Sequence, residues 1–477
     1  MRNLSQLARE RIVLAIVCTG VALASLDLFV VNVALPDMGR QFGVGLDRLS
    51  WVISAYAITY ASLLVVLGRV ADRHARDRGF LVGVATFVAG SSLCAAAPTA
   101  SFLIAARVVQ AAGAALLTPT SLGLVLTTTA PERRGSAVRA WTAIGGLAAA
   151  IGPVVGGLLV TLSWRWVFVI NVPVGAVALV LGWRLLPRLP GHAGPRPDVV
   201  GAVLVTGAVA LVTWALVDGT SWGWTSTRTV GTFVAAIVAG VAFAWRSAVQ
   251  CNPLIDRGTL RAAGFISAST VAAVFTAAFG AMLLSIVLWQ QQVWHWSALR
   301  TGFAVAPGPL MVPLFSFFVV GGLLRKWGPA IVAAAGCATF AAGTLWWLVA
   351  ITLDRSYAAT LLPGILLTGI GVGLALPTLM TAATTSLPES SAATGSAVIN
   401  MARQIGLAIG VALLVGVVGA PASPSGALGA FRRGWLVVTV LAVTAAVLSV
   451  TLLRAGARPR AVGASPATTP ALAGGAR

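Results

Sequence analysis

The chain has 477 residues, of which 58% are hydrophobic and only 9% are charged, and its mean hydropathy is +0.94. Soluble domains carry roughly 25% charged residues, so this composition excludes a soluble protein. A net charge of +20 would suggest nucleic-acid binding in a soluble chain, but here the basic residues lie in short gaps between apolar runs. We therefore expect them to face the anionic surface of a lipid bilayer, and we expect no nucleic-acid partner.

Fourteen apolar runs are long enough to span a membrane, because a spanning helix needs about 20 mostly apolar residues. Glycine, proline and charged clusters mark the breaks between them. The sequence thus predicts an all-α polytopic membrane protein. The predicted spans are 12–35, 51–69, 79–97, 101–126, 137–160, 166–186, 198–217, 229–247, 264–289, 301–323, 330–352, 357–381, 396–418 and 433–453.

The distribution of basic residues orients these spans. With the N-terminus in the cytoplasm, 22 Lys and Arg residues fall on the cytoplasmic side and 8 on the outside, while Arg107 and Arg403 fall inside spans. The positive-inside rule then places both termini in the cytoplasm. Basic positions are almost all arginine, and alanine and glycine are abundant, which suggests a GC-rich bacterial genome and hence the bacterial plasma membrane. No removable signal peptide is predicted.

Two pairs of distant segments are alike. PTSLGLVLTTTAPERRGSAV at 119–138 matches PTLMTAATTSLPESSAATGSAV at 377–398, and GRVADRHA at 68–75 matches GLLRKWG at 322–328. Similar loop composition is the alternative explanation, but two matches in the same order favour a duplicated half, as in secondary transporters. The predicted domains are a cytoplasmic tail (1–11), a six-helix half (12–186), two inserted helices with their loops (187–247), a second six-helix half (248–453) and a disordered cytoplasmic tail (454–477).

The segment GRVADRHARDRGFL at 68–81 places one acid among several arginines. We interpret Gly68, Asp72, Arg73 and Arg76 as parts of a gating loop, since ion pairs at a cytoplasmic seam can form in one state and break in another. Positive-inside topology alone explains the arginines, but it does not explain Asp72.

Helices 4 and 5 carry two further motifs. In IAARVVQAAGAALLTP, Arg107 lies inside the membrane, where lipid exposure of a charge is costly, so it should face the protein interior. In AIGGLAAAIGPVVGG at 143–157, small residues recur at intervals of four, which favours close contact between helices, and Pro153 adds a bend. Ordinary tight packing would explain this spacing equally well.

Together these motifs resemble those of the major facilitator superfamily, in particular its fourteen-helix drug:proton antiporter branch of the EmrB/QacA type. GRVADRHARDRGF, RVVQAAGAA, GPVVGG, LDLFVVNVALP, WRWVFVINVPVG and SAVINMARQIGLAIG carry the resemblance. It implies two six-helix halves with two inserted central helices, and it makes Gly152, Pro153, Gly156 and Gly157 the antiporter motif. Ala75, Asp77 and Ala111 depart from the usual pattern.

Asp27 is the only carboxylate well inside a predicted span. At about 1.5 Å of rise per residue, Asp27 lies roughly 12 Å and Arg107 roughly 9 Å below the same membrane face. If helices 1 and 4 are neighbours, as the resemblance implies, the two side chains can pair or share a water-filled cavity. We interpret them as the proton-coupling residues, with the proton gradient as energy source and no cofactor; the alternative is a fixed, non-titrating pair.

The resemblance places the substrate cavity among helices 1, 4, 5, 9, 10 and 13. Aromatic and apolar walls with few polar groups suit amphipathic, drug-like molecules. The second half has no acid within its spans, which favours neutral, monocationic or anionic substrates. The candidate cavity residues are Asn32, Gln110, Trp289, Gln290, Gln291, Asn400, Arg403 and Gln404.

The predicted function is export of drugs, antibiotics or secondary metabolites in exchange for protons, by a protein that works as a monomer. A proton-coupled importer or facilitator of a small metabolite with the same fold is the alternative. An enzyme is not expected, because the three histidines lie in separate loops and no nucleophile–base pair or metal-ligand cluster is visible.

Overall fold

The computed structural model describes residues 6–73, 75–189, 198–251, 253–255, 257–387, 392–419 and 423–456. Across these residues there is no β-strand, and fourteen helices are long and apolar enough to cross a membrane. The predicted fourteen spans are therefore confirmed. We call the end of the bundle that holds the turn between the first two helices the outer end, following the predicted orientation.

The first half of the chain forms one bundle. Its helices are α1 (Gln6–Phe42), α2 (Leu46–Arg73), α3 (Arg76–Ala95), α4 (Ala100–Thr128), α5 (Pro131–Val160), the short α6 (Trp166–Val169) and α7 (Asn171–Leu185). α1 packs on α4, α5 and α7, α3 packs on α4 and α7, and α2 packs on α4.

The second half forms a bundle in which the same pairs recur. Its helices are the short α10 (Arg257–Arg261), α11 (Ala263–Leu288) with the π-helical turn η1 (Trp289–Val293), α12 (Ala298–Val305), α13 (Pro307–Phe318), α14 (Val320–Ala350), the π-helical turn η2 (Tyr357–Leu361), α15 (Leu362–Thr385), α16 (Ala392–Val418) and α17 (Pro424–Gly456). α11 packs on α15, α16 and α17 as α1 packs on α4, α5 and α7, and α14 packs on α15 and α17 as α3 packs on α4 and α7. The packing thus repeats, in agreement with the repeated sequence motifs.

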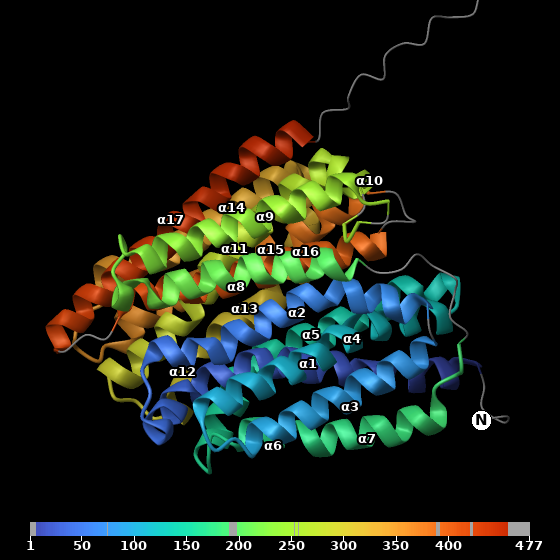
Figure 1. The fold of residues 1–477 in the computed structure, drawn as a ribbon, viewed down its shortest axis with the longest axis horizontal. Helices are drawn as coiled ribbons and strands as arrows, with labels where there is room; N and C mark the ends of the chain where they lie inside the picture. The colour runs from blue at the N-terminus through green and yellow to red at the C-terminus, as the bar shows by residue number, and fades with distance from the viewer. Residues whose placement is uncertain are drawn as a thin grey trace, which may run out of the picture.

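Two further helices, α8 (Val199–Trp222) and α9 (Thr227–Val249), lie beside the boundary between the halves (Figure 1). α8 contacts α2 of the first half and α16 of the second, and α9 packs mainly on α8. The Nε atom of Arg246 donates to Oδ1 of Asp198 at 2.8 Å, which joins the start of α8 to the end of α9. The inserted pair is therefore a hairpin whose first helix touches both halves.

Several helices begin or end a few residues away from the predicted bounds, as α2, α5 and α17 do, and two differences have a visible origin. α1 continues through Pro36 to Phe42, beyond the predicted end near residue 35, so this proline lies inside the helix and does not end it. α14 begins at Val320 and contains a break at Gly328, where φ is +74°. This left-handed conformation suits glycine, and Pro329 follows it, so the kink replaces the predicted loop before residue 330.

Glycines allow the helices of the second half to approach closely. Gly406 and Gly410 on α16 face the carbonyl oxygens of Ala273 and Ala277 on α11, with no room for a methyl group. In a membrane, where lipid is as apolar as leucine, such close packing contributes much of the association between helices.

We expect Gly410→Ala to lower the thermal midpoint of the purified protein by several degrees, because the new methyl group would overlap the Ala277 carbonyl and force the helices apart at a cost of about 1–3 kcal/mol. Gly231→Ala on α9, where a methyl group would meet open space, is the matched control and should leave the midpoint unchanged. Equal midpoints for both variants would contradict the packing role assigned to Gly410.

Candidate functional site

The carboxylate of Asp27 lies at the centre of a polar cluster in the first half. Asp27 is 1% exposed, and its Oδ2 atom forms an ion pair with Nη1 of Arg107, which is equally buried. Its Oδ1 atom accepts hydrogen bonds from Nε2 of Gln110 at 2.8 Å and from Nδ2 of Asn171 at 3.2 Å. The similar depth inferred from sequence therefore corresponds to a direct contact, and α1, α4 and α7 supply its members.

Ser91 on α3 completes the cluster. Its Oγ atom accepts from Nε2 of Gln110 at 2.7 Å and from Nδ2 of Asn171 at 3.2 Å. The sequence analysis missed both Ser91 and Asn171. Asn171 is a polar residue inside an apolar run and that signal could have found it, whereas a serine in a helix with many small residues gives no such signal.

Arg107 has several supports besides Asp27. Its Nε atom donates to the backbone oxygen of Val52 at 3.0 Å, and its Nη1 atom donates to Oε1 of Gln110 at 2.6 Å. The guanidinium carbon lies 4.0 Å from the centre of the Tyr56 ring, a cation–π contact that is strong where water is excluded. The guanidinium group would therefore stay in place even if Asp27 lost its charge.

The segment of α5 predicted to be the antiporter motif contacts both halves. Gly156 lies against the backbone of Val30 and Gly152 against Phe29, both on α1 close to Asp27. On the other side, Gly157 faces the backbone of Ala298, and the Pro153 carbonyl faces Gly302, both on α12 of the second half. Through these contacts α5 joins the helix that carries Asp27 to the opposite half.

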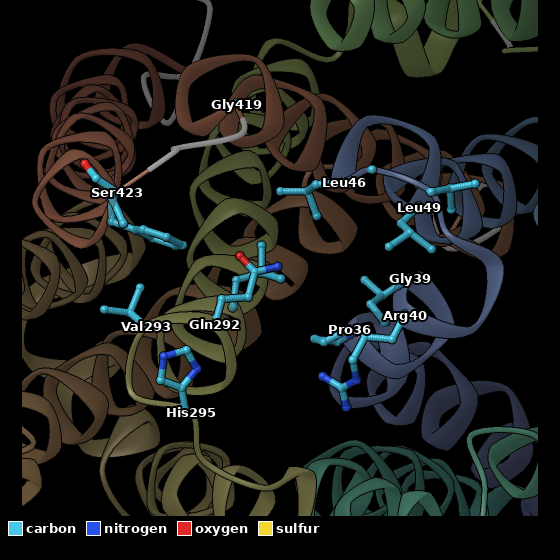
Figure 2. Close-up of a pocket in the computed structure, with 16 residues that line it drawn as sticks. Pro36, Gly39, Arg40, Leu46, Leu49, Gln292, Val293, His295, Gly419 and Ser423 are labelled. Carbon is cyan, nitrogen blue, oxygen red and sulfur yellow. The ribbon is translucent and has the colours of Figure 1, made fainter.

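A cavity of about 570 Å³ opens at the outer end between the two halves (Figure 2). α1 and α2 form one wall, and η1 and α17 form the other. The Arg40 side chain lies on the first wall, across the opening from His295 and Gln292. Its size matches that of cavities that hold drug-sized molecules.

A second cavity lies deeper and is nearly filled. It has about 10 Å³ of free volume, roughly the space of one water molecule. α1, α2, α11 and α16 supply its lining: Leu28, Phe29, Asn32, Ile53, Gly280, Leu283, Leu407 and Val411. The two halves thus close on each other at the centre of the molecule in this conformation.

The candidate cavity residues separate into several groups. Asn32 lines the central cavity, and Gln110 belongs to the Asp27 cluster. Gln291 donates from Nε2 to the backbone oxygen of Val33 at 3.0 Å, a contact between the halves. Trp289 and Gln290 line neither cavity: both are fully buried, and Trp289 packs against Phe431 and Trp435 in an aromatic cluster. The sequence could not show that these two side chains are buried, because hydrophobic periodicity does not say which neighbouring helix an apolar helix packs against.

The three candidates on α16 lie along its inner half. Nη1 of Arg403 donates to Oδ1 of Asn400 at 3.0 Å, and Asn400 itself donates to the backbone oxygen of Ser396 at 2.9 Å. Gln404 is half-buried beside them.

In the predicted gating loop, Gly68 lies against the Pro119 ring at ordinary contact distance, and the Arg76 side chain lies against Gly123. These contacts hold the loop to α4. The side chains of Asp72 and Arg73 lie outside the described residues, so their predicted gating role stays a prediction.

The family model described as Major Facilitator Superfamily matches residues 17–411. The chain belongs to the major facilitator superfamily. Its two bundles with two added helices are the superfamily's fold in a fourteen-helix form, and it is a transporter, not an enzyme.

Curated relatives cover most of the chain. The multidrug resistance protein Stp of Mycobacterium tuberculosis (strain CDC 1551 / Oshkosh) is 34% identical over 85% of this chain and 76% of its own length. The methylenomycin A resistance protein of Bacillus subtilis (strain 168) is 32% identical over 84% and 86%, respectively. The tetracenomycin C resistance and export protein of Streptomyces glaucescens is 30% identical over 83% and 74%.

Solved transporter structures share the fold at low identity. A bacterial homologue of the lysosomal transporter Spinster, in an inward-facing and unoccupied conformation, aligns with a TM-score of 0.67 at 17% identity, over 94% of this chain and 97% of its own. A peptide transporter in complex with sulfate aligns with a TM-score of 0.68 at 16% identity, over 93% and 95%.

We expect Arg107→Gln to destabilise the transporter by about 3–5 kcal/mol, because it leaves the Asp27 carboxylate buried without its cation. The double variant Asp27→Asn/Arg107→Gln removes both charges and should recover most of that loss. Thermal melts in one detergent compare the three proteins. A single variant as stable as the wild type would show that the pair is hydrated, not buried.

We also expect Gly157→Ala to reduce transport about tenfold or more, because its methyl group would lie 2.6 Å from the Ala298 carbonyl oxygen and separate α5 from α12. Gly146→Ala on the same helix meets open space and should transport normally. Efflux rates in cells at matched expression test this pair. Full activity of Gly157→Ala would contradict a working contact at this position.

Proposed function

We propose that this protein exports drug-like or antibiotic small molecules in exchange for protons by alternating access. It would act as a monomer in the bacterial plasma membrane with both termini in the cytoplasm. The observation that carries the proposal is the Asp27–Arg107 pair, a buried carboxylate whose cation has further partners in the Val52 carbonyl, Gln110 and the Tyr56 ring.

A proton and the guanidinium group compete for the Asp27 carboxylate. When the carboxylate is ionised, Arg107 neutralises it, and both charges are shielded from lipid. When Asp27 is protonated, it no longer attracts Arg107 strongly. The cation then remains with the Val52 carbonyl, Gln110 and the Tyr56 ring. Two protonation states therefore correspond to two arrangements of α1 and α4, which is what a proton-driven conformational change requires.

The contacts of α5 would carry this change to the second half. Gly152 and Gly156 lie against α1 within a few residues of Asp27, and Gly157 and Pro153 lie against α12. A small shift of α1 would therefore alter the contact between the halves at the outer end. In the proposed cycle Asp27 takes a proton from the outside, the halves rock inward, Asp27 releases the proton, and substrate binds.

The cavities support a substrate of drug size. The outer cavity has the volume for such a molecule, and the central cavity lined by Leu28, Phe29 and Leu283 would widen as the halves separate. Relatives named for resistance to multiple drugs, methylenomycin A and tetracenomycin C support an antibiotic-like substrate.

The direction of transport separates this proposal from a proton-coupled importer or facilitator. The printed name of the tetracenomycin C relative includes export, which favours efflux. An efflux-deficient bacterial strain that expresses the protein should gain resistance to at least one compound in a panel containing methylenomycin A, tetracenomycin C and rhodamine 123.

For the compound so identified, everted vesicles should accumulate it only when a pH gradient is imposed. Asp27→Asn should abolish the dependence on that gradient, because the substituted amide cannot bind the coupled proton. Asp37→Asn, which removes a carboxylate from the Asp37–Arg40 pair at the outer end of α1, is the matched control and should behave like the wild type. Gradient-dependent uptake that survives in Asp27→Asn would rule out the coupling role.

A further inference from the structure

The membrane-embedded arginine of the second half, Arg403, differs from that of the first. Among the described residues no carboxylate pairs with Arg403, and its buried Nε atom has no hydrogen-bond partner. Its one side-chain partner is the amide oxygen of Asn400, at 3.0 Å. Arg107, by contrast, has a carboxylate, a backbone carbonyl, an amide and an aromatic ring.

An unneutralised arginine inside a membrane is costly, at least a few kcal/mol by insertion scales, and such residues are usually functional. A buried donor with no acceptor adds to that cost. Among the described residues neither a carboxylate for its charge nor an acceptor for its Nε–H is found, and these two unmet requirements of Arg403 point to a ligand that supplies both.

Arg403 lies on the face of α16 that lines the transport route. Leu407 and Val411, one and two helical turns further out, line the central cavity, so Arg403 lies roughly 6 Å inward of it. The opposite wall at this level is α2, which packs on α16, and Tyr60 of α2 belongs to a buried cluster against which Ala397 of α16 packs. Tyr60 donates to Oγ1 of Thr118 at 3.1 Å and follows Ile53, another cavity residue, by two turns.

We propose that Arg403, with Asn400 beside it and α2 opposite, binds the anionic group of the transported molecule. The ligand class is a carboxylate or phenolate on an apolar body. The anionic group would accept from the free Nε–H of Arg403, and the apolar body would extend toward Leu407 and the central cavity. This assignment rests on the proposed export function and names its substrate class.

The position of Arg403 also makes the proposed anion site depend on the conformation of the transporter. α2 belongs to the first half and Arg403 to the second, so the site is complete only when α2 and α16 lie together at this level. Arg403 is half-buried in this conformation, and separation of the inner ends would open the site around it further and admit an anion. Asp27 remains in its own cluster in the first half, so proton and substrate occupy different sites.

The test compares two fluorescent probes that share one xanthene body. Fluorescein is negatively charged and rhodamine 123 positively charged at neutral pH. Binding of each to the full-length protein in nanodiscs of zwitterionic lipid is measured by fluorescence anisotropy. We expect the wild type to bind fluorescein about tenfold or more tightly than rhodamine 123, and Arg403→Gln to lose that preference, because a charge-assisted hydrogen bond is removed.

Two further variants separate binding from folding. Arg403→Lys keeps the charge and should retain part of the preference for fluorescein. Arg432→Gln removes an arginine at the outer end of the same half, one that also has a buried unpartnered Nε atom, and should bind like the wild type. Equal fluorescein affinity in the wild type and a folded Arg403→Gln variant, or no fluorescein binding by the wild type, would overturn the assignment.

An anionic lipid headgroup has the same chemistry, so a second set of nanodiscs contains phosphatidylglycerol. Fluorescein affinity that is unchanged in these nanodiscs supports a substrate site, whereas displacement by the lipid would overturn it in favour of a headgroup site. The proposed export function is tested separately. If vesicles take up rhodamine 123 in a proton-dependent manner while fluorescein does not bind, the export function stands and the anion site fails.

Discussion

The cost of keeping charge out of water governs this molecule. Asp27 and Arg107 are each 1% exposed, and each neutralises the charge of the other in that buried site. Their pairing fixes the relative positions of α1 and α4, and Gln110, Asn171 and Ser91 extend the network to α3 and α7. One interaction therefore holds the first half together, and the proposed proton coupling depends on the same pair.

The second half repeats the packing of the first but not its chemistry. α11, α14, α15, α16 and α17 pair with one another as α1, α3, α4, α5 and α7 do, yet among the described residues no carboxylate pairs with Arg403 of α16, which is half-buried. The first half, by contrast, holds the neutralised Asp27–Arg107 pair. The halves meet along α2 with α16 and along α5 with α12, and small residues at the second contact bring the two backbones close together.

Much of the architecture follows from the sequence because the bilayer allows few solutions. Spans must be apolar and about 20 residues long, so all fourteen could be located, and the repeated motifs at 119–138 and 377–398 indicated the duplication. Similar depth along two helices, together with the neighbouring positions that the family resemblance implies for them, was enough to predict that Asp27 and Arg107 pair or share a cavity. It was harder to predict which neighbour each helix faces, because an apolar helix such as α11 gives no periodic signal. The sequence therefore could not show that Trp289 lies in an aromatic cluster or that Gln290 is fully buried. Ser91 and the kink at Gly328 depend on tertiary contacts and backbone angles that local composition does not encode.

The most direct measurement is an infrared difference titration of the purified transporter, with the carboxyl band of Asp27 assigned by its absence in an Asp27→Asn sample. The account predicts that a protonated carboxyl signal from this residue grows as the pH falls through the range in which the transporter works, and that bands of the arginine side chains change with it. A carboxylate signal from Asp27 that stays constant across the whole of that range would show a permanently ionised, structural pair and would contradict proton coupling at this site.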